Sequence, residues 1–134
     1  MDEITSVGVD LAKEVIVVGA ATREGRAVYF RQFSFTGFAA WAVRLAPCRF
    51  GLEACSSAHH WGRWLESQGH VAQLMAAEFV NPYRKSRGAK NDRNDAEAIL
   101  IVSALRDPNM RFVAIKSVKQ KSILAWHRMR SGYQ

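Results

Sequence analysis

Four acidic residues lie at positions where solubility alone does not explain a carboxylate: Asp10, Glu53, Asp92 and Asp95. The first two interrupt apolar runs, and a bare carboxylate in such a strand is costly unless it is paired or bound to a cation. Asp10 has the small residues Gly8 and Ala12 on its own side of the strand, which leaves room for an ion. Because carboxylate oxygens are hard ligands, the four residues together predict a Mg²⁺ or Mn²⁺ site.

A cluster of this kind suits phosphoryl transfer. Two divalent cations held by shared carboxylates can hold the attacking and leaving oxygens of an in-line displacement. We therefore predict that the four carboxylates are both metal ligands and catalytic residues. At about 100° per helical residue, Asp92 and Asp95 fall in one stripe with Ala96, Ile99 and Ser103, so both should point toward the core.

Ordinary structural roles remain open for three of these carboxylates. Asp92 and Asp95 would complement the dipole at the start of a helix without binding metal. Glu53 would form an ion pair with Arg49 or Arg63.

Basic residues crowd the approach to the two later aspartates: they are Arg84, Lys85, Arg87, Lys90 and Arg93. The net charge of +7 arises in the last part of the chain, since residues 1–80 carry seven basic and eight acidic residues and residues 81–134 carry twelve and four. Such a segment suits a polyanion that passes the carboxylates, so we predict that these five residues bind nucleic-acid phosphates. A solvated basic loop is the plain alternative.

Other polar and aromatic residues indicate structural roles. His59 and His60 would point about 100° apart on a helix, so at most one can contribute to a site. Ser56 and Ser57 are expected to cap a helix, because no base lies at a recognisable offset for a nucleophile. Four tryptophans at helical spacings predict core or docking surface: Trp41, Trp61, Trp64 and Trp126.

The composition fits one domain with its own core, since 49% of the 134 residues are hydrophobic. No run approaches the roughly 20 apolar residues of a membrane span, and the amino end lacks the regions of a signal peptide. A cytoplasmic location is therefore expected. Cys48 and Cys55 flank a predicted strand beyond disulfide reach, so both are expected to be reduced, buried thiols.

Runs of β-branched or aromatic residues with polar breaks between them predict strands over residues 4–10, 14–22 and 27–35, and two further strands are expected over 48–55 and 70–76. Thr36 is expected to cap a helix between the third and fourth strands, and a second helix should run from Ser56 or Ser57 to Gly69.

Beyond the fifth strand, residues 77–90 contain Pro82, Gly88 and clustered positive charge, which predicts a mobile loop. A third helix is expected from Asn91 to Arg106, followed by a short extended piece over 111–116. The core stripe of that helix is predicted to be Ala96, Ile99, Leu100, Ser103 and Ala104. Residues 1–116 would form the domain, and 117–134 the start of a helix leading to a further domain.

This element order predicts the ribonuclease H-like fold, an α/β fold in which a mixed five-stranded sheet is flanked by helices. In that arrangement the first and fourth strands lie side by side. Asp10 and Glu53 would then meet near one edge of the sheet, and the first turn of the third helix would lie across them.

Three segments resemble DEDD-type insertion-sequence transposases, a family that includes the Piv invertase. They are Val7-Gly-Val-Asp10-Leu-Ala-Lys13, Gly51-Leu-Glu53-Ala-Cys-Ser-Ser-Ala-His-His-Trp61 and Lys90-Asn-Asp92-Arg-Asn-Asp95-Ala-Glu-Ala98. The resemblance covers nearly the whole chain and is to the amino-terminal domain of the family, which is similar to the Holliday-junction resolvase RuvC.

The resemblance implies that Asp10, Glu53, Asp92 and Asp95 are the DEDD metal ligands of a recombinase that cleaves and rejoins DNA. It further implies a carboxy-terminal domain with a catalytic serine and an RNA of the element that can guide target choice. A homo-oligomer is a separate expectation for the partners of this chain, and the sequence does not define the oligomeric state. The chain ends at Gln134, where members of the family continue, so it is expected to be a separately expressed domain or a truncated gene product.

Two alternatives remain open. Residues 8–12 have a faint similarity to the first phosphate loop of actin-like and sugar-kinase-like nucleotide-binding modules, but the glycine or hydroxyl residues expected after Asp10 are missing. A short chain with a basic end also fits a non-catalytic module that binds nucleic acid or another protein.

Overall fold

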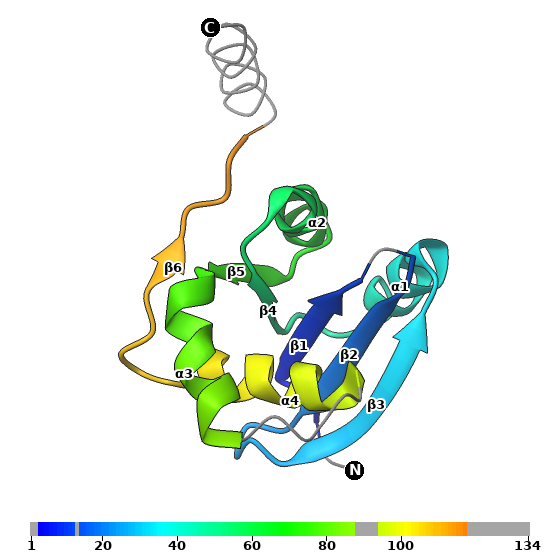
Figure 1. The fold of residues 1–134 in the computed structure, drawn as a ribbon. Helices are drawn as coiled ribbons and strands as arrows, with labels where there is room; N and C mark the ends of the chain where they lie inside the picture. The colour runs from blue at the N-terminus through cyan, green and yellow to red at the C-terminus, as the bar shows by residue number, and fades with distance from the viewer. Residues whose placement is uncertain (1–2, 13, 88–93, 118–134) are drawn as a thin grey trace, which may run out of the picture.

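The computed structural model describes residues 3–12, 14–87 and 94–117, which form one mixed sheet with helices on both faces (Figure 1). The strands are β1 (Ser6–Leu11), β2 (Ile16–Ala21), β3 (Ala27–Phe33), β4 (Arg49–Glu53), β5 (Val71–Met75) and β6 (Phe112–Val113). The helices are α1 (Phe35–Ala42), α2 (Ser56–Ser67), α3 (Ala77–Arg87) and α4 (Asn94–Leu105). The predicted order of elements as far as the fifth strand is confirmed.

The strands lie in the order β3-β2-β1-β4-β5-β6. Strand β1 is antiparallel to β2 and parallel to β4, so the prediction that the first and fourth strands are neighbours is confirmed. The count of five strands was wrong, because part of the extended piece expected over residues 111–116 forms β6, which pairs antiparallel with β5. The arrangement is compatible with a ribonuclease H-like fold.

Side chains alternate along the strands, and the two faces of the sheet differ as a result. One face packs against α1 and α2 through fully buried side chains that include Val9, Phe50, Leu52 and Leu74. The other face carries three glycines, Gly8, Gly19 and Gly51, which lie next to one another in the register of β2, β1 and β4.

Helix α4 runs directly over this row of glycines (Figure 1). A Cβ atom on Gly8 would lie 2.5 Å from the carbonyl oxygen of Ala98, and one on Gly51 would lie 2.9 Å from Leu105 Cδ2. A Cβ on Gly19 would lie 3.3 Å from that of Ala98. The helix therefore rests close to the strand backbone, and this contact requires residues without side chains.

The face of α4 that meets the sheet differs from the predicted stripe. Its buried residues are Ala98, Ile101, Val102, Ala104 and Leu105. Ala104 is thus confirmed and Ser103, which is exposed, was wrong. The side chains of Ala96, Ile99 and Leu100 lie outside the described part. Because apolar residues fill most positions of this helix, its own sequence does not determine which face is buried. The row of glycines on the sheet determines that face.

The predicted loop over residues 77–90 was also wrong, because residues 77–87 form α3. Pro82 lies inside this helix and suggested a break, since it removes one backbone hydrogen bond. Val80 and the partly buried Tyr83 pack with Met75 and with α4 in a second apolar cluster. That burial stabilises the helix in spite of its proline.

Both predicted helix caps need correction. Ser34, not Thr36, caps α1, and its Oγ accepts a hydrogen bond of 3.1 Å from the backbone N–H of Gly37. The N-cap of α2 is Cys55, whose side chain makes no capping bond, rather than Ser56 or Ser57.

The two cysteines have different environments. Cys48 is buried, and burial raises the pKa of its thiol to about 12. Cys55 is exposed, so the prediction of two buried thiols was wrong for this residue, which starts α2 at the surface. Buried His70 lies beside Cys48, where its Nδ1 accepts from the Cys48 N–H at 3.2 Å and its Nε2 donates to the Ala42 carbonyl at 2.8 Å. In the described part of the chain, no helix has the length and apolar character that crossing a membrane requires.

Candidate metal centre

The first two predicted ligands lie on neighbouring strands. In the β1–β4 ladder Gly8 is opposite Gly51 and Val9 is opposite Leu52, and the same offset places Asp10 beside Glu53. Parallel neighbours lie about 4.8 Å apart, so both side chains leave the sheet from adjacent points. Each is partly buried at the carboxyl end of its strand.

Both carboxylates are on the α4 face of the sheet. Each follows a glycine of the row by two residues, and residues two apart along a strand share a face. Since α4 covers the glycines, the carboxylates lie immediately past the helix toward the ends of the strands. Carboxylate oxygens at such a position fit a hard divalent cation.

The later pair of predicted ligands is associated with the start of α4. Asp95 is the second residue of this helix, three positions before Ala98, and its side chain lies outside the described part. Asp92 falls outside the described residues altogether. Within the described residues, no three histidine, cysteine, aspartate or glutamate side chains gather into a possible metal site. A site of four carboxylates therefore requires Asp92 and the side chain of Asp95, which lie outside the described part.

The alternative of an ion pair for Glu53 is not decided by the arginines proposed for it. Arg49 Nε donates a hydrogen bond to Gln73 Oε1, and its guanidinium lies over the ring of Phe112 at 5.5 Å. Arg63 donates to the carbonyl of Lys116. Both arginines thus help to attach the edge of the domain around β6, whatever else they contact.

The basic residues predicted to bind phosphate fall into two groups. Arg84, Lys85 and Arg87 belong to the last turns of α3, although their side chains are outside the described part. Lys90 and Arg93 lie outside the described residues. These three positions at the end of α3 are close in sequence to the later aspartates.

The histidine and tryptophan predictions are confirmed where the structure describes them. His59 is buried, and its Nδ1 accepts a hydrogen bond of 3.1 Å from the backbone N–H of Lys116. Trp41, Trp61 and Trp64 pack against the main apolar cluster. Trp126 lies outside the described residues.

An open cleft of about 600 Å³ lies between the end of β1 and the first turns of α1 and α2. It is lined by Leu11, Ala12, Phe35, Ser56, Ser57, His60, Trp61 and Arg63. Leu11 and Ala12 directly follow Asp10, so this cleft and the carboxylates share the carboxyl end of β1. Sequence reasoning did not find it, because Phe35 and Arg63 are distant in the chain and only the fold brings them together.

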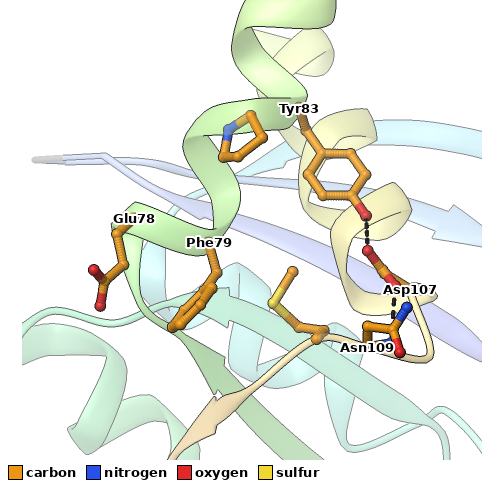
Figure 2. Close-up of a pocket in the computed structure, with 7 residues that line it drawn as sticks. Glu78, Phe79, Tyr83, Asp107 and Asn109 are labelled. Atoms are coloured by element: carbon orange, nitrogen blue, oxygen red, sulfur yellow. Dashed lines mark hydrogen bonds between the residues drawn. The ribbon is translucent and has the colours of Figure 1, made fainter.

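A second cleft, of about 390 Å³, lies between α3 and the segment that follows α4 (Figure 2). Tyr83 donates its hydroxyl hydrogen bond to Asp107 Oδ2, while the backbone N–H of Asn109 donates to Asp107 Oδ1 at 2.8 Å. These two bonds hold the pKa of Asp107 below its ordinary value of 3.8. The same hydrogen bond, with burial and the neighbouring carboxylate, raises the pKa of Tyr83 to about 12.

The chain is similar to several proteins named as transposases, whereas no family model matches it. It is 41% identical over 128 residues to a "Probable family 20 transposase" of Pseudomonas aeruginosa, which covers 96% of this chain and 37% of that protein. Its identity to the transposase for insertion sequence element IS1111A of Coxiella burnetii is 35% over 130 residues, or 97% of the chain and 35% of the relative. The chain is 32% identical over 132 residues to the transposase for insertion sequence element IS1328 of Yersinia enterocolitica. The match covers 98% of this chain and 38% of that protein. The chain thus spans somewhat more than a third of the length of these relatives, all of which are named as transposases and two of which are named for insertion sequence elements.

Proposed function

We propose that this chain is the RuvC-like catalytic domain of a DEDD-type transposase, and that it takes part in metal-dependent cleavage and rejoining of DNA strands. The observation that carries the proposal is the position of Asp10 beside Glu53 on one face of two parallel strands, the same face that α4 covers. The similarity to named transposases of insertion sequences supports DNA as the substrate.

The proposed metal ligands are Asp10 and Glu53 from the sheet and Asp92 and Asp95 from the start of α4. Bound Mg²⁺ or Mn²⁺ would neutralise charge on the reacting phosphate and lower the pKa of an attacking water or hydroxyl. The protein's own contribution is positional. The glycine row lets α4 approach the strand backbone, and we propose that this approach allows Asp92 and Asp95 to join Asp10 and Glu53 around the metal.

Basic residues complete the proposed active site. Arg84, Lys85 and Arg87 in α3, with Lys90 and Arg93 after it, would hold the DNA backbone as it passes the carboxylates. A further domain with a catalytic serine and a guide RNA from the element belong to the same proposal and rest on the family resemblance alone. Association with a second copy of the chain is a further part of the proposal.

The test is the effect of Mn²⁺ on thermal unfolding of the wild type and of Asp10→Asn, Glu53→Gln and Asp95→Asn. A metal that binds only the folded state at about 100 times its Kd adds roughly 2.7 kcal/mol to stability. Each variant should lose this shift, yet should melt no lower than the wild type without metal, because it removes one anion from a repulsive cluster.

Glu66→Gln is a matched control, since Glu66 is an exposed carboxylate on α2. It should keep the full metal shift. Equal shifts in the wild type and in all three variants would refute the metal site. DNA binding that is indifferent to both metal and these variants would favour the non-catalytic module instead.

A further inference from the structure

The cleft at the end of β1 combines features that suit an unpaired nucleotide. It is about 600 Å³ in volume, which is large enough for a nucleobase with its sugar and phosphate. Its lining residues include the aromatic rings of Phe35 and Trp61 and the polar or basic side chains of Ser56, Ser57 and Arg63. Clefts of this composition bind single-stranded nucleic acid by stacking bases on rings and pairing phosphates with cations.

The aromatic side is built around Trp61. Phe35 meets the Trp61 ring edge to face, with centroids 6.2 Å apart, and the ring of His60 does the same at 5.5 Å. On the side away from the cleft, Trp61 is held by Phe38 at 5.1 Å and by Trp64 at 5.6 Å. Trp61 is therefore fixed by its neighbours, while Phe35 remains 43% exposed.

An exposed phenylalanine next to exposed polar residues needs an explanation. Phe35 is the first residue of α1, where helix formation does not require an aromatic side chain. Its ring borders the cleft instead of filling the core beneath α1, which Phe38 occupies. A flat apolar surface with an open face is what base stacking uses.

The charge of the cleft is complementary to phosphate. Its lining residues include the cationic Arg63, and none of the described residues that line it is acidic. Arg63 uses one Nη1 hydrogen bond to hold the carbonyl of Lys116, which fixes the guanidinium at the rim. Ser56 and Ser57 add hydroxyl groups on the same rim.

We infer that this cleft binds an unpaired nucleotide of the DNA substrate next to the strand held at the carboxylates, with the base on Phe35 and the phosphate on Arg63. The inference rests on the proposed function for the identity of the substrate. It adds that DNA near the reacting phosphate is unpaired, because a base within a duplex cannot stack on a protein side chain without leaving its partner.

The test measures binding of a short labelled oligothymidylate and of a duplex of equal length by fluorescence anisotropy, with EDTA present. Under these conditions the carboxylate site is without metal, so the result does not depend on it. Phe35→Leu keeps apolar bulk but removes the ring, and it should weaken single-strand binding about tenfold while leaving duplex binding within about twofold.

Arg63→Gln provides a second, independent readout. It should lower the slope of log K against log salt for the single strand by about 0.7, and Arg63→Lys should restore the slope because one positive charge is enough. The matched controls are Phe79→Leu, an exposed aromatic on α3, and Arg44→Gln, an exposed arginine after α1. Both should bind as the wild type does.

Unchanged single-strand affinity in Phe35→Leu with an unchanged salt slope in Arg63→Gln would overturn the inference. An equal loss for single strand and duplex would also overturn it, since the surface would then be a general electrostatic one. If Asp10→Asn shows the same Mn²⁺-induced shift in thermal unfolding as the wild type, while oligothymidylate binding depends on Phe35, the cleft is supported and the metal site is not. The reverse pattern supports the metal site alone.

Discussion

The two faces of the sheet pack against their helices in different ways. The face toward α1 and α2 is filled by branched and aromatic side chains, such as Leu52 and Phe50, that interlock with Phe38. The face toward α4 has three neighbouring glycines where such side chains would be, and it ends in Asp10 and Glu53. The first arrangement buries apolar surface, whereas the second brings a helix backbone close to the strands.

This difference indicates a division of roles. Large side chains contribute most of the burial free energy, and small residues contribute little. A close helix approach gives up burial and fixes position, which matters where ligands from a helix and a strand must meet. The α1 and α2 face should therefore govern stability, and the α4 face should govern the metal site.

The largest expected effect on stability comes from Leu52→Ala. Leu52 is fully buried, and truncation leaves a cavity that should lower the free energy of unfolding by about 2–5 kcal/mol. Val28→Ala, at a side chain that is 44% exposed, should change it by less than about 0.5 kcal/mol. Chemical denaturation measures both. Leu52→Ala should nevertheless keep its Mn²⁺ shift, and a loss of that shift would show that the two faces are not separate.

Gly8→Ala, on the face toward α4, is expected to lower the free energy of unfolding by a smaller amount than Leu52→Ala does. The added Cβ would meet the Ala98 carbonyl oxygen at 2.5 Å and the Val102 nitrogen at 2.9 Å, both backbone atoms that cannot rotate away. Either α4 or β1 must move, at a cost of about 1–3 kcal/mol. The displacement of α4 should also abolish the Mn²⁺ shift.

Gly51→Ala is the matched control for this change. Its Cβ would meet a methyl of Leu105 at 2.9 Å, at the far end of a flexible side chain. The leucine can change rotamer, so the loss of stability should be smaller and part of the metal shift should remain. Equal effects of the two alanines would contradict the idea that the backbone contact at Gly8 sets the position of α4.

The contrast between the faces also explains which parts of the fold the sequence predicts. Short apolar runs bounded by polar or turn residues predict β1, β2, β4 and β5, and the neighbouring positions of the first and fourth strands follow from the order of elements. Helix α4 is different, because its nearly continuous apolar run would allow several of its faces to pack against the sheet. The row of glycines on the strands determines which face does so. Residues 77–87 were missed for a similar reason. Their local signal is Pro82, but the burial of Val80 against α4 decides the conformation.

The candidate site divides along the same line. Asp10 and Glu53 are recognisable because a carboxylate in an apolar strand is unusual, and the ladder that joins them follows from the fold. The nucleotide cleft is different, since Phe35 on α1 and Arg63 on α2 become neighbours only when both helices pack on the same face. No spacing in the sequence connects them.

The smallest expected effect concerns Tyr83→Phe, which removes the hydrogen bond that joins α3 to the segment after α4 (Figure 2). The pKa of Asp107 is below its ordinary 3.8 in the folded state, so the stabilisation is present above that pH and is lost as the pH falls. The pKa of Tyr83 is raised from 10.0 to about 12, so its stabilisation is complete below pH 10 and is lost as the pH rises toward 12. The stability difference between wild type and Tyr83→Phe should therefore be largest between about pH 4 and 10 and should shrink on both sides. Urea unfolding across this range measures the difference.

Tyr29→Phe is the control from the other face, because the Tyr29 hydroxyl accepts from Trp41 Nε1 at 3.0 Å without a carboxylate in that hydrogen bond. Its effect should not shrink as the pH falls through the range in which Asp107 titrates. A Tyr83→Phe difference that is constant with pH would show that the hydroxyl adds packing rather than a charge-assisted hydrogen bond, and α3 would then be held to the α4 face by apolar contacts alone.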